Sequence, residues 1–156
     1  MVECQRMTQA SLPDALRLLS MFLGQDVYYL DSSRAYGDGR RGALSDALDL
    51  FLRRPELGFV WLAYEEHEPV GVCVVCLAIS TSMGAVVAKL DDVYITAGKQ
   101  RQGIGSIHLT QLKEELRRLG VRRVDTSVHL QNRQARRFYE RHGFLPLHEE
   151  RLACVL

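Results

Sequence analysis

The sequence predicts an α/β (α+β) fold in which a mixed, mostly antiparallel central sheet carries helices on both faces. Two observations lead to this class. Apolar residues recur at helical spacing in several segments, and apolar, β-branched runs bounded by turn formers fill the middle of the chain. Later strands alternate with helices, which favours parallel pairing there. With 156 residues and 47% hydrophobic content, we expect one core and a single domain over residues 1–156.

The first third of the chain is expected to contain one strand and two helices. Residues 2–7 form a candidate strand, and Ser11-Leu12-Pro13 is typical of an N-cap followed by proline in the first turn of a helix that reaches about Phe22. From Gly24 to Gly42, turn formers and tyrosines mix without a clear period, which predicts a loop. Leucines at every fourth position then predict a helix over residues 43–52.

The remaining elements follow from the same signals. Three strands of an antiparallel meander are expected first, and two strand-alternating helices that each end at a glycine are expected after them. A final extended segment should supply the last one or two strands of the sheet. The three meander strands are 58–64, 70–80 and 85–95. The helices are 103–119 and 132–142, a further strand lies between them at 123–128, and the final segment runs to residue 156.

Charge and composition restrict the class of protein. The formal net charge is +1, but residues 97–143 hold eleven Lys and Arg against four Asp and Glu, and the rest of the chain holds nine against fifteen. One face can therefore hold an anion and another a cation. No apolar run is long enough to span a bilayer and no secretory signal is present, so a cytoplasmic protein with reduced cysteines is expected.

The segment Gln100-Arg101-Gln102-Gly103-Ile104-Gly105-Ser106 follows a predicted strand and opens a helix. Glycines let the backbone approach a ligand, and unpaired amides at the positive end of a helix suit a phosphate. A tight turn without a ligand is the alternative explanation. The spacing excludes the phosphate loop of ATP-binding proteins and the dinucleotide fingerprint, because neither glycine pattern is complete.

Two motifs together resemble the GNAT superfamily of N-acetyltransferases. Gln100, Gly103 and Gly105 fill its pattern Q/R-x-x-G-x-G/A, and residues 132–144 fill a second pattern, N-x-x-A-x-x-F-Y-x-x-x-G-F. The resemblance implies a GNAT-like sheet splayed around acetyl-CoA and direct transfer of the acetyl group to an amine in a ternary complex. A homodimer is also expected, since dimers are common among such proteins.

The resemblance also implies a set of cofactor-binding residues. Amides after Arg101 would hold the pyrophosphate, the edge of a strand would bond the pantetheine and the acetyl carbonyl, and two arginines are candidates for the 3′-phosphate. The implied residues are Val93, Tyr94, Ile95, Gln100, Arg101, Gln102, Gly103, Ile104, Gly105, Ser106, Asn132, Arg133 and Tyr139.

Three residues are nominated for catalysis by the same resemblance. Tyr139 stands where the superfamily often places its general acid, and an aromatic anchor beside Phe138 is the alternative role. Asp91 and Asp92 stand where relatives often carry the base. Strand alternation predicts that their side chains point to opposite faces, so that only one reaches the cleft, and Asp91 is favoured.

The acceptor amine is expected to contact the segment between the first two helices. Carboxylates and phenols there would suit a cation or a polyol through charge, cation–π contact and hydrogen bonding. The predicted acceptor residues are Asp26, Tyr28, Tyr29, Asp31 and Tyr36. A polyamine, an aminoglycoside-like amine and a protein amine all stay open as acceptors.

A metal site and a non-catalytic role are the alternatives to this interpretation. Cys73 and Cys76 lie within one strand at positions that face opposite sides, and the histidines show no metal-binding spacing, so no metal is expected. His129, just past a strand, could approach the cleft. A non-catalytic binding module, either a CoA sensor or a nucleic-acid binder using the arginine-rich helix, is the alternative function.

Overall fold

The computed structural model describes residues 1–36 and 42–156, the side chains of residues 32–36 excepted. None of the helices in these described residues is long and apolar enough to cross a membrane. The strands are β1 (Val2–Arg6), β2 (Gly58–Glu65), β3 (Glu68–Ser80), β4 (Ala85–Ile95) and β5 (Val124–Thr126). The helices are α1 (Leu12–Gln25), α2 (Val27–Tyr36), α3 (Ala43–Arg53), α4 (Ile104–Arg118) and α5 (Arg133–Arg141), with a 3-10 turn at Ala97–Lys99.

The five strands form one sheet in the order β1-β2-β3-β4-β5. Neighbouring strands pair antiparallel except for β4 and β5, which are parallel and are joined by the crossover helix α4. The parallel pairing is short, because it extends only from Ala88 to Leu90 of β4. The predicted fold class is therefore confirmed.

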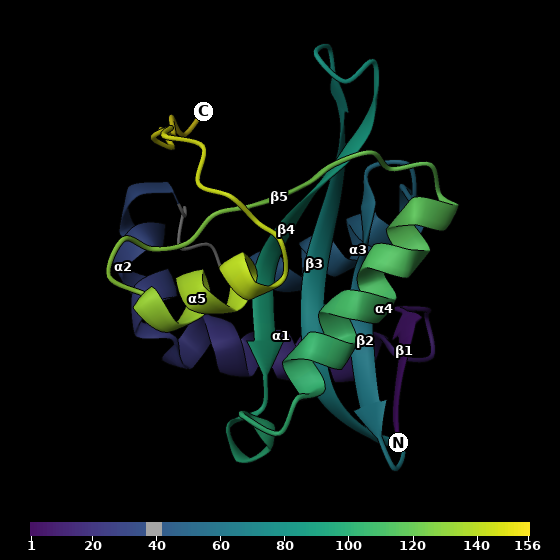
Figure 1. Cartoon of the computed structure of the whole chain (residues 1–156). Helices are drawn as coiled ribbons and strands as arrows, with labels where there is room; N and C mark the ends of the chain where they lie inside the picture. The colour runs from purple at the N-terminus through teal and green to yellow at the C-terminus, as the bar shows by residue number, and fades with distance from the viewer. Residues whose placement is uncertain (37–41) are drawn as a thin grey trace.

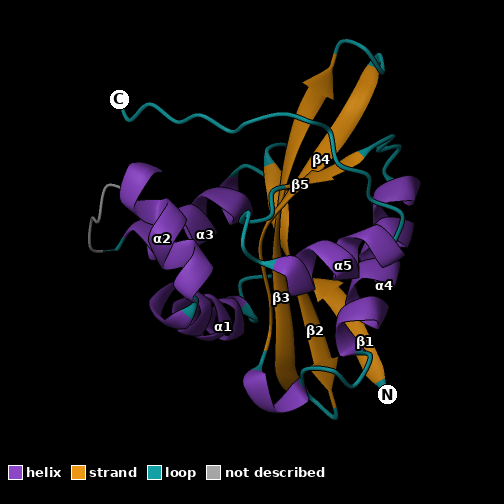
Figure 2. Ribbon diagram, turned by 60° about the vertical axis from the view of Figure 1, so that its left-hand side comes forward, coloured by secondary structure: helices purple, strands orange, loops and turns teal. Residues whose placement is uncertain are grey.

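Helices cover both faces of the sheet, and the two layers separate clearly in Figure 2. On one face α1 and α3 pack through the fully buried Leu18, Leu19 and Leu48, and α2 lies on the same side in contact with α1. On the other face α4 contributes Leu109, Leu112 and Leu116 to a core that α5 completes. Strand β3 is buried between the layers from Pro69 to Val75, which explains its nearly continuous apolar sequence.

The loop predicted between Gly24 and Gly42 is wrong over most of its length, because α2 occupies Val27–Tyr36. Asp26 separates α1 from α2 and caps the second helix, since its carboxylate accepts a hydrogen bond of 2.8 Å from the backbone N–H of Tyr29. Helix α2 has weak amphipathic character, so its sequence lacks the apolar period that revealed the other helices.

The predicted last strand is also wrong. Residues 144–156 have no regular secondary structure, and those from Leu145 onward are exposed. The preceding strand is shorter than residues 123–128, because β5 covers only Val124–Thr126. The sheet consequently ends at β5, and no strand of the described residues pairs with the outer edge of β5.

Candidate active site

The sheet opens where β4 and β5 diverge, on the face covered by α5 (Figure 1). The parallel ladder ends at Leu90, whose carbonyl accepts a hydrogen bond of 3.2 Å from the hydroxyl of Thr126. Beyond that point β4 continues for five more residues without a strand partner on this side among the described residues. An extended ligand can bond to this strand edge in place of a strand.

Backbone groups of β4 point into this opening at alternate positions. The N–H of Thr96 donates to the carbonyl of Val70 at 2.9 Å, so Tyr94 and Thr96 turn their hydrogen-bonding groups toward β3. Val93 and Ile95 therefore turn theirs toward the side that β5 has left. The resemblance nominated the edge formed by Val93, Tyr94 and Ile95 for a pantetheine chain and an acetyl carbonyl. The backbone groups of Val93 and Ile95 are open to such a ligand, but those of Tyr94 are turned toward β3, so its nomination for backbone bonding is wrong.

A β-bulge changes the predicted placement of the two aspartates. The β3–β4 register shifts between Val72 and Val74, and Asp92 has a φ of +50°, in the left-handed region. One residue is thus inserted into β4 opposite Cys73. The simple alternation that put Asp91 and Asp92 on opposite faces does not hold here, because a bulge interrupts the two-residue period.

The two carboxylates differ in environment. The side chain of Asp91 forms an ion pair of 3.3 Å with Lys89. Burial and the neighbouring charge of Asp91 raise the pKa of Asp92 to about 6, although Lys89 and Arg151 oppose the shift. A carboxylate with this pKa can hold or release a proton near neutral pH, so Asp92 has the better chemistry for a general base.

Tyr139 lies on α5 with 8% of its surface exposed. Its ring packs edge-to-face against Phe138 and Phe144 at centroid distances of 5.3 and 5.2 Å. Burial, helped by the neighbouring Cys73 and Asp91, raises the pKa of the phenol, and the Thr126 side chain hydrogen-bonds with it. Tyr139 therefore serves as an aromatic anchor, and its phenol keeps its proton at the point where β4 and β5 separate.

The glycine-rich segment forms a helix N-terminus with an open approach. Gly103 is the N-cap of α4 and has a φ of +83°, and no atom lies within 4 Å of the position that a Cβ would take. The side chains of Gln100 and Gln102 donate to the carbonyls of Ile95 and Gly98 at 2.8 and 3.0 Å. These bonds fold the loop back on itself and fix the turn that leads into α4.

Gly105 has a different environment. A Cβ there would lie 3.5 Å from the ring of Phe138 and 3.8 Å from Ile95. The small size of Gly105 thus allows the N-terminus of α4 to lie close to α5, the helix that carries Tyr139.

The residues around this N-terminus fit a phosphorylated ligand. The first amides of a helix lack backbone acceptors and point along the axis, where the helix dipole favours an anion. Arg101 and Arg133 are exposed, and neither forms an ion pair with a described residue. Asn132 uses its side-chain oxygen to cap α5 by accepting a 3.1 Å bond from the Ala135 N–H, which leaves its NH₂ group as a donor.

The predicted acceptor residues lie on or next to α2, and two of them contact His129, which follows β5. The carboxylate of Asp31 lies 2.7 Å from Nε2 of His129, and the ring of Tyr28 lies 5.1 Å from that of His129. Asp26 is the helix cap described above, so part of its hydrogen-bonding capacity is used by the backbone. Tyr36 ends α2, and its side chain lies outside the described part of the chain.

An aromatic row continues from α2 to the sheet. Phe22 lies between Tyr29 and Tyr94, at centroid distances of 5.6 and 5.8 Å. Sequence reasoning missed Phe22 and Thr126 as site residues. No local signal could have identified Thr126, because its role depends on the parallel pairing of β5 with β4.

Across the described residues, no group of three or more His, Cys, Asp or Glu is placed to hold a metal ion.

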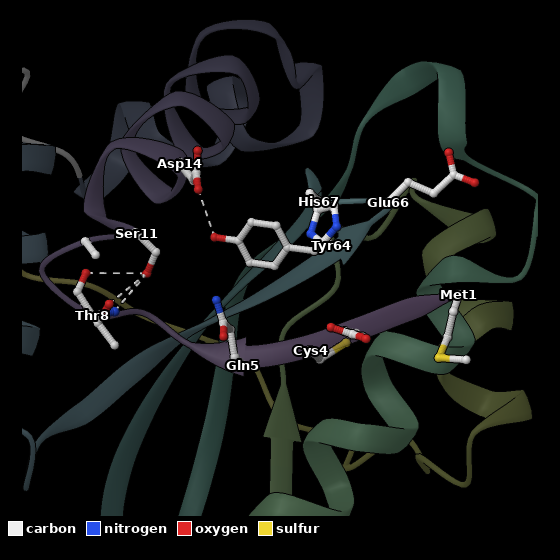
Figure 3. A pocket seen from close by; sticks show the side chains of 11 residues that line it. Met1, Cys4, Gln5, Thr8, Ser11, Asp14, Tyr64, Glu66 and His67 are labelled. Atoms are coloured by element: carbon white, nitrogen blue, oxygen red, sulfur yellow. Dashed lines mark hydrogen bonds between the residues drawn. The ribbon is translucent and has the colours of Figure 1, made fainter.

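A separate polar hollow of about 620 Å³ lies beside β1 and the start of α1 (Figure 3). Tyr64 donates a 2.9 Å hydrogen bond to Asp14 there, and the N–H of Thr8 donates to the hydroxyl of Ser11. None of the predicted site residues lines this hollow. It lies at the β1 edge of the sheet, whereas the opening described above lies at the β5 edge.

Comparisons with known proteins agree with this geometry. The model of the Acetyltransferase (GNAT) family matches residues 25–144, which include both motifs. A comparison with curated protein sequences finds no match.

Several solved structures share the fold. A transcriptional regulator from Bacillus halodurans is 21% identical, with a TM-score of 0.78 and 99% of each chain covered. A predicted acetyltransferase from Clostridium acetobutylicum, solved with acetyl-CoA, is 15% identical, with a TM-score of 0.73 over 99% of this chain and 96% of the other. An aminoglycoside acetyltransferase from an uncultured soil metagenomic sample, in complex with sisomicin, is 19% identical, with a TM-score of 0.71 over 98% and 93%.

Proposed function

This chain belongs to the GNAT acetyltransferase family, and from that premise we propose that it transfers an acetyl group from acetyl-CoA directly to a primary amine. The proposal assigns Asp92 as the general base and Tyr139 as the general acid. It assigns the helix N-terminus at Gly103 to the cofactor phosphates and the opening between β4 and β5 to the pantetheine chain.

The proposed chemistry divides between the cofactor and the residues of the opening. Acetyl-CoA, when bound, supplies an acetyl group activated as a thioester and a thiol as the leaving group. Asp92 would accept a proton from the ammonium group of the acceptor, which frees the nitrogen lone pair for attack, and the backbone N–H groups of Val93 and Ile95 would polarise the carbonyl that is attacked. Tyr139 donates its proton to the departing sulfur. Each step uses a group whose protonation state near neutral pH suits it.

Charge and aromatic rings support a cationic acceptor. Asp91 and Asp92 lie on β4 beside the opening, Asp31 on α2 is hydrogen-bonded to His129, and Tyr28 and Tyr29 lie on the same helix. Carboxylates attract an ammonium group, and aromatic rings stabilise it further through cation–π contact. Among the similar structures, one is an aminoglycoside acetyltransferase in complex with sisomicin. We therefore favour small polycationic amines over protein amines as acceptors.

The observation that carries the proposal is the buried, partly neutral Asp92 at a bulge beside the open edge of β4. The test is thiol release from acetyl-CoA in the presence of a panel of polyamines, aminoglycosides and N-terminal peptides. Turnover with at least one amine is expected, and it should fall strongly in Asp92→Asn. Retained turnover in that variant would remove Asp92 from the mechanism.

Binding and turnover separate the proposed enzyme from a non-catalytic module. Acetyl-CoA at 100 times its dissociation constant should stabilise the fold by about 2.7 kcal/mol in thermal unfolding. Stabilisation without turnover over the whole panel would identify a CoA sensor. No stabilisation, together with salt-sensitive binding to RNA or DNA, would favour the nucleic-acid binder instead.

A further inference from the structure

The phenol of Tyr139 is enclosed, so loss of its proton would leave an anion in largely apolar surroundings. The residue is 8% exposed, and the rings of Phe138 and Phe144 pack against its ring. Desolvation penalises a buried anion unless a hydrogen-bond donor compensates for the lost water. A phenol in this setting can act as an acid only if a donor stabilises the phenolate that remains.

The side chain of Thr126 is placed to be that donor. Among the described residues it is the one side chain that hydrogen-bonds with the phenol of Tyr139. Burial is the largest cause of the raised pKa of Tyr139, Cys73 and Asp91 add to it, and the bond with Thr126 opposes it. Thr126 therefore favours the ionised form of the phenol, whereas the other neighbours disfavour it.

The hydroxyl of Thr126 has a second partner. It donates a hydrogen bond of 3.2 Å to the carbonyl of Leu90. A hydroxyl has one hydrogen and two lone pairs, so Thr126 can only accept from the phenol while its hydrogen is directed at Leu90. Hydrogen bonds to an ionised group are roughly twice as strong as those between neutral groups. Ionisation of Tyr139 therefore favours rotation of this hydrogen from Leu90 to the phenolate.

The sheet fixes the position of the Thr126 hydroxyl. Thr126 is the last residue of β5 and lies opposite Leu90 at the end of the parallel ladder. Its branched side chain has few allowed rotamers, and the residue is partly buried. The hydroxyl is thus held where β4, β5 and α5 meet, within reach of both the carbonyl and the phenol.

We propose that Thr126 is a positioning residue for acid catalysis, whose hydroxyl accepts from the phenol of Tyr139 in the resting enzyme and donates to its oxygen during proton transfer. In that transfer the O–H bond of Tyr139 breaks and an S–H bond forms on the departing thiolate. The hydrogen of Thr126 turns from Leu90 to the phenolate without leaving Thr126. The phenolate takes a proton back from water after the thiol has left. This inference rests on the proposed function, because Thr126 acts through Tyr139.

The first test compares two substitutions of Thr126 in steady-state kinetics with an amine that is turned over. Thr126→Val keeps the shape of the side chain but removes the hydroxyl, so kcat should fall about tenfold or more while KM for acetyl-CoA stays within about twofold. Thr126→Ser keeps the hydroxyl and should restore kcat to within about threefold of the wild-type value. Thr110→Val, on the exposed face of α4, is the control and should match the wild type.

A double-mutant cycle separates this role from a merely structural one. In a chain that carries Tyr139→Phe no phenolate forms, so adding Thr126→Val should cause no further loss of kcat. Thr126→Ala removes the hydroxyl without adding a methyl group, and it repeats the cycle independently of how the valine variant folds. Additive losses of kcat in the cycle would mean that Thr126 acts independently of Tyr139, and they would overturn the proposal.

The same measurements distinguish failure of this inference from failure of the proposed function. Wild-type kcat in Thr126→Val, together with a loss in Tyr139→Phe, would overturn the role of Thr126 and leave the acid in place. Wild-type kcat in Tyr139→Phe would overturn the acid assignment and, with it, the role of Thr126. Absence of turnover with every amine of the panel would overturn the proposed function and this inference together.

Discussion

Nε2 of His129 lies 2.7 Å from the carboxylate of Asp31, so one hydrogen bond joins α2 to the connection between β5 and α5 across 98 residues of sequence. The backbone N–H of Gln131 donates to Nδ1 of the same ring at 3.2 Å. Nδ1 is therefore the acceptor, and Nε2 carries the hydrogen that is donated to Asp31. This pair holds α2, which carries the proposed acceptor residues, against the connection that leads to α5 and Tyr139.

Asp31→Ala should weaken acceptor binding more than chemistry. Loss of the bond to His129 frees α2, and loss of the carboxylate removes a charge from the cation site. We expect KM for the amine to rise about tenfold or more while kcat changes less, which is the signature of lost ground-state binding. Asp49→Ala, which removes an exposed carboxylate paired with Arg53 on α3, is the control and should leave KM unchanged.

Asp92→Asn should lower kcat/KM by about 10²- to 10⁴-fold, as expected for loss of a general base. The wild-type rate should rise with pH through about 6, because Asp92 must be ionised to accept a proton. The variant should lose this limb of the pH profile. Asp91→Asn provides the comparison, since Asp91 shares the strand and the charge; a larger loss there than at Asp92 would reverse the assignment of the base.

Tyr139→Phe should reduce kcat about tenfold or more and leave acetyl-CoA binding intact, because only the acidic proton is removed. The ring would keep its contacts with Phe138 and Phe144. Tyr64→Phe removes a phenol whose pKa is also raised, to about 12, at the opposite edge of the sheet. The control variant Tyr64→Phe should keep its turnover and at most lose stability. Unchanged turnover in Tyr139→Phe would exclude Tyr139 as the general acid.

Gly103→Glu should abolish acetyl-CoA binding, measured by calorimetry. The substitution puts a carboxylate at the helix N-terminus, where the phosphates are proposed to bind, and it strains a backbone with a φ of +83°. Gly120→Glu is a matched control at the other end of α4, with a φ of +79° and equally open surroundings. Both variants carry the strain, so a loss of binding confined to position 103 isolates the effect of the glutamate side chain at the proposed phosphate site.

Stability should depend on pH through His108, which is buried with no hydrogen-bond partner for Nε2 among the described residues. Burial lowers its pKa from 6.5 to about 4, although the contact with Trp61 opposes the shift. Between these values the folded state binds fewer protons than the unfolded chain. The contribution of His108 to the free energy of unfolding should therefore fall by about 3 kcal/mol as the pH drops from 7 to 4.

The opposite effect of Asp92 has to be separated from that of His108. The pKa of Asp92 is raised from 3.8 to about 6, so its folded form binds more protons in that interval and gains relative stability as the pH falls. Urea titrations of His108→Leu and Asp92→Asn at pH 7, 5 and 4 isolate the two contributions. If the free energy of unfolding of His108→Leu changed between pH 7 and 4 by the same amount and with the same sign as that of the wild type, a contribution from His108 would be excluded.

The sequence allowed prediction of those features that depend on local pattern. The N-terminus of α4 was predicted because Gly103 and the flanking residues form a contiguous motif, and the central strands because apolar runs mark β2 and β3. Helix α2 was missed, since tyrosines and serines obscure its period; the capping residue Asp26, followed at a helical distance by Tyr29, was the available signal.

Features that depend on distant pairing were not predictable from the sequence. The bulge at Asp92 arises from the register between β3 and β4, and nothing in the local sequence reports a register shift. The bond between Thr126 and Leu90 likewise exists only after a parallel crossover brings two strands together. The raised pKa of Asp92 follows mainly from burial, which is a consequence of tertiary structure.

The contact of Gly105 with Phe138 links residues that belong to two separate motifs. Alanine at position 105 would meet the ring at an ordinary van der Waals distance of 3.5 Å, but a longer side chain would collide with it. A residue larger than alanine at position 105 therefore requires a smaller residue at position 138. Across related sequences, residues 105 and 138 should covary in volume, and a genetic screen should find that a large residue at 105 is rescued by a small one at 138.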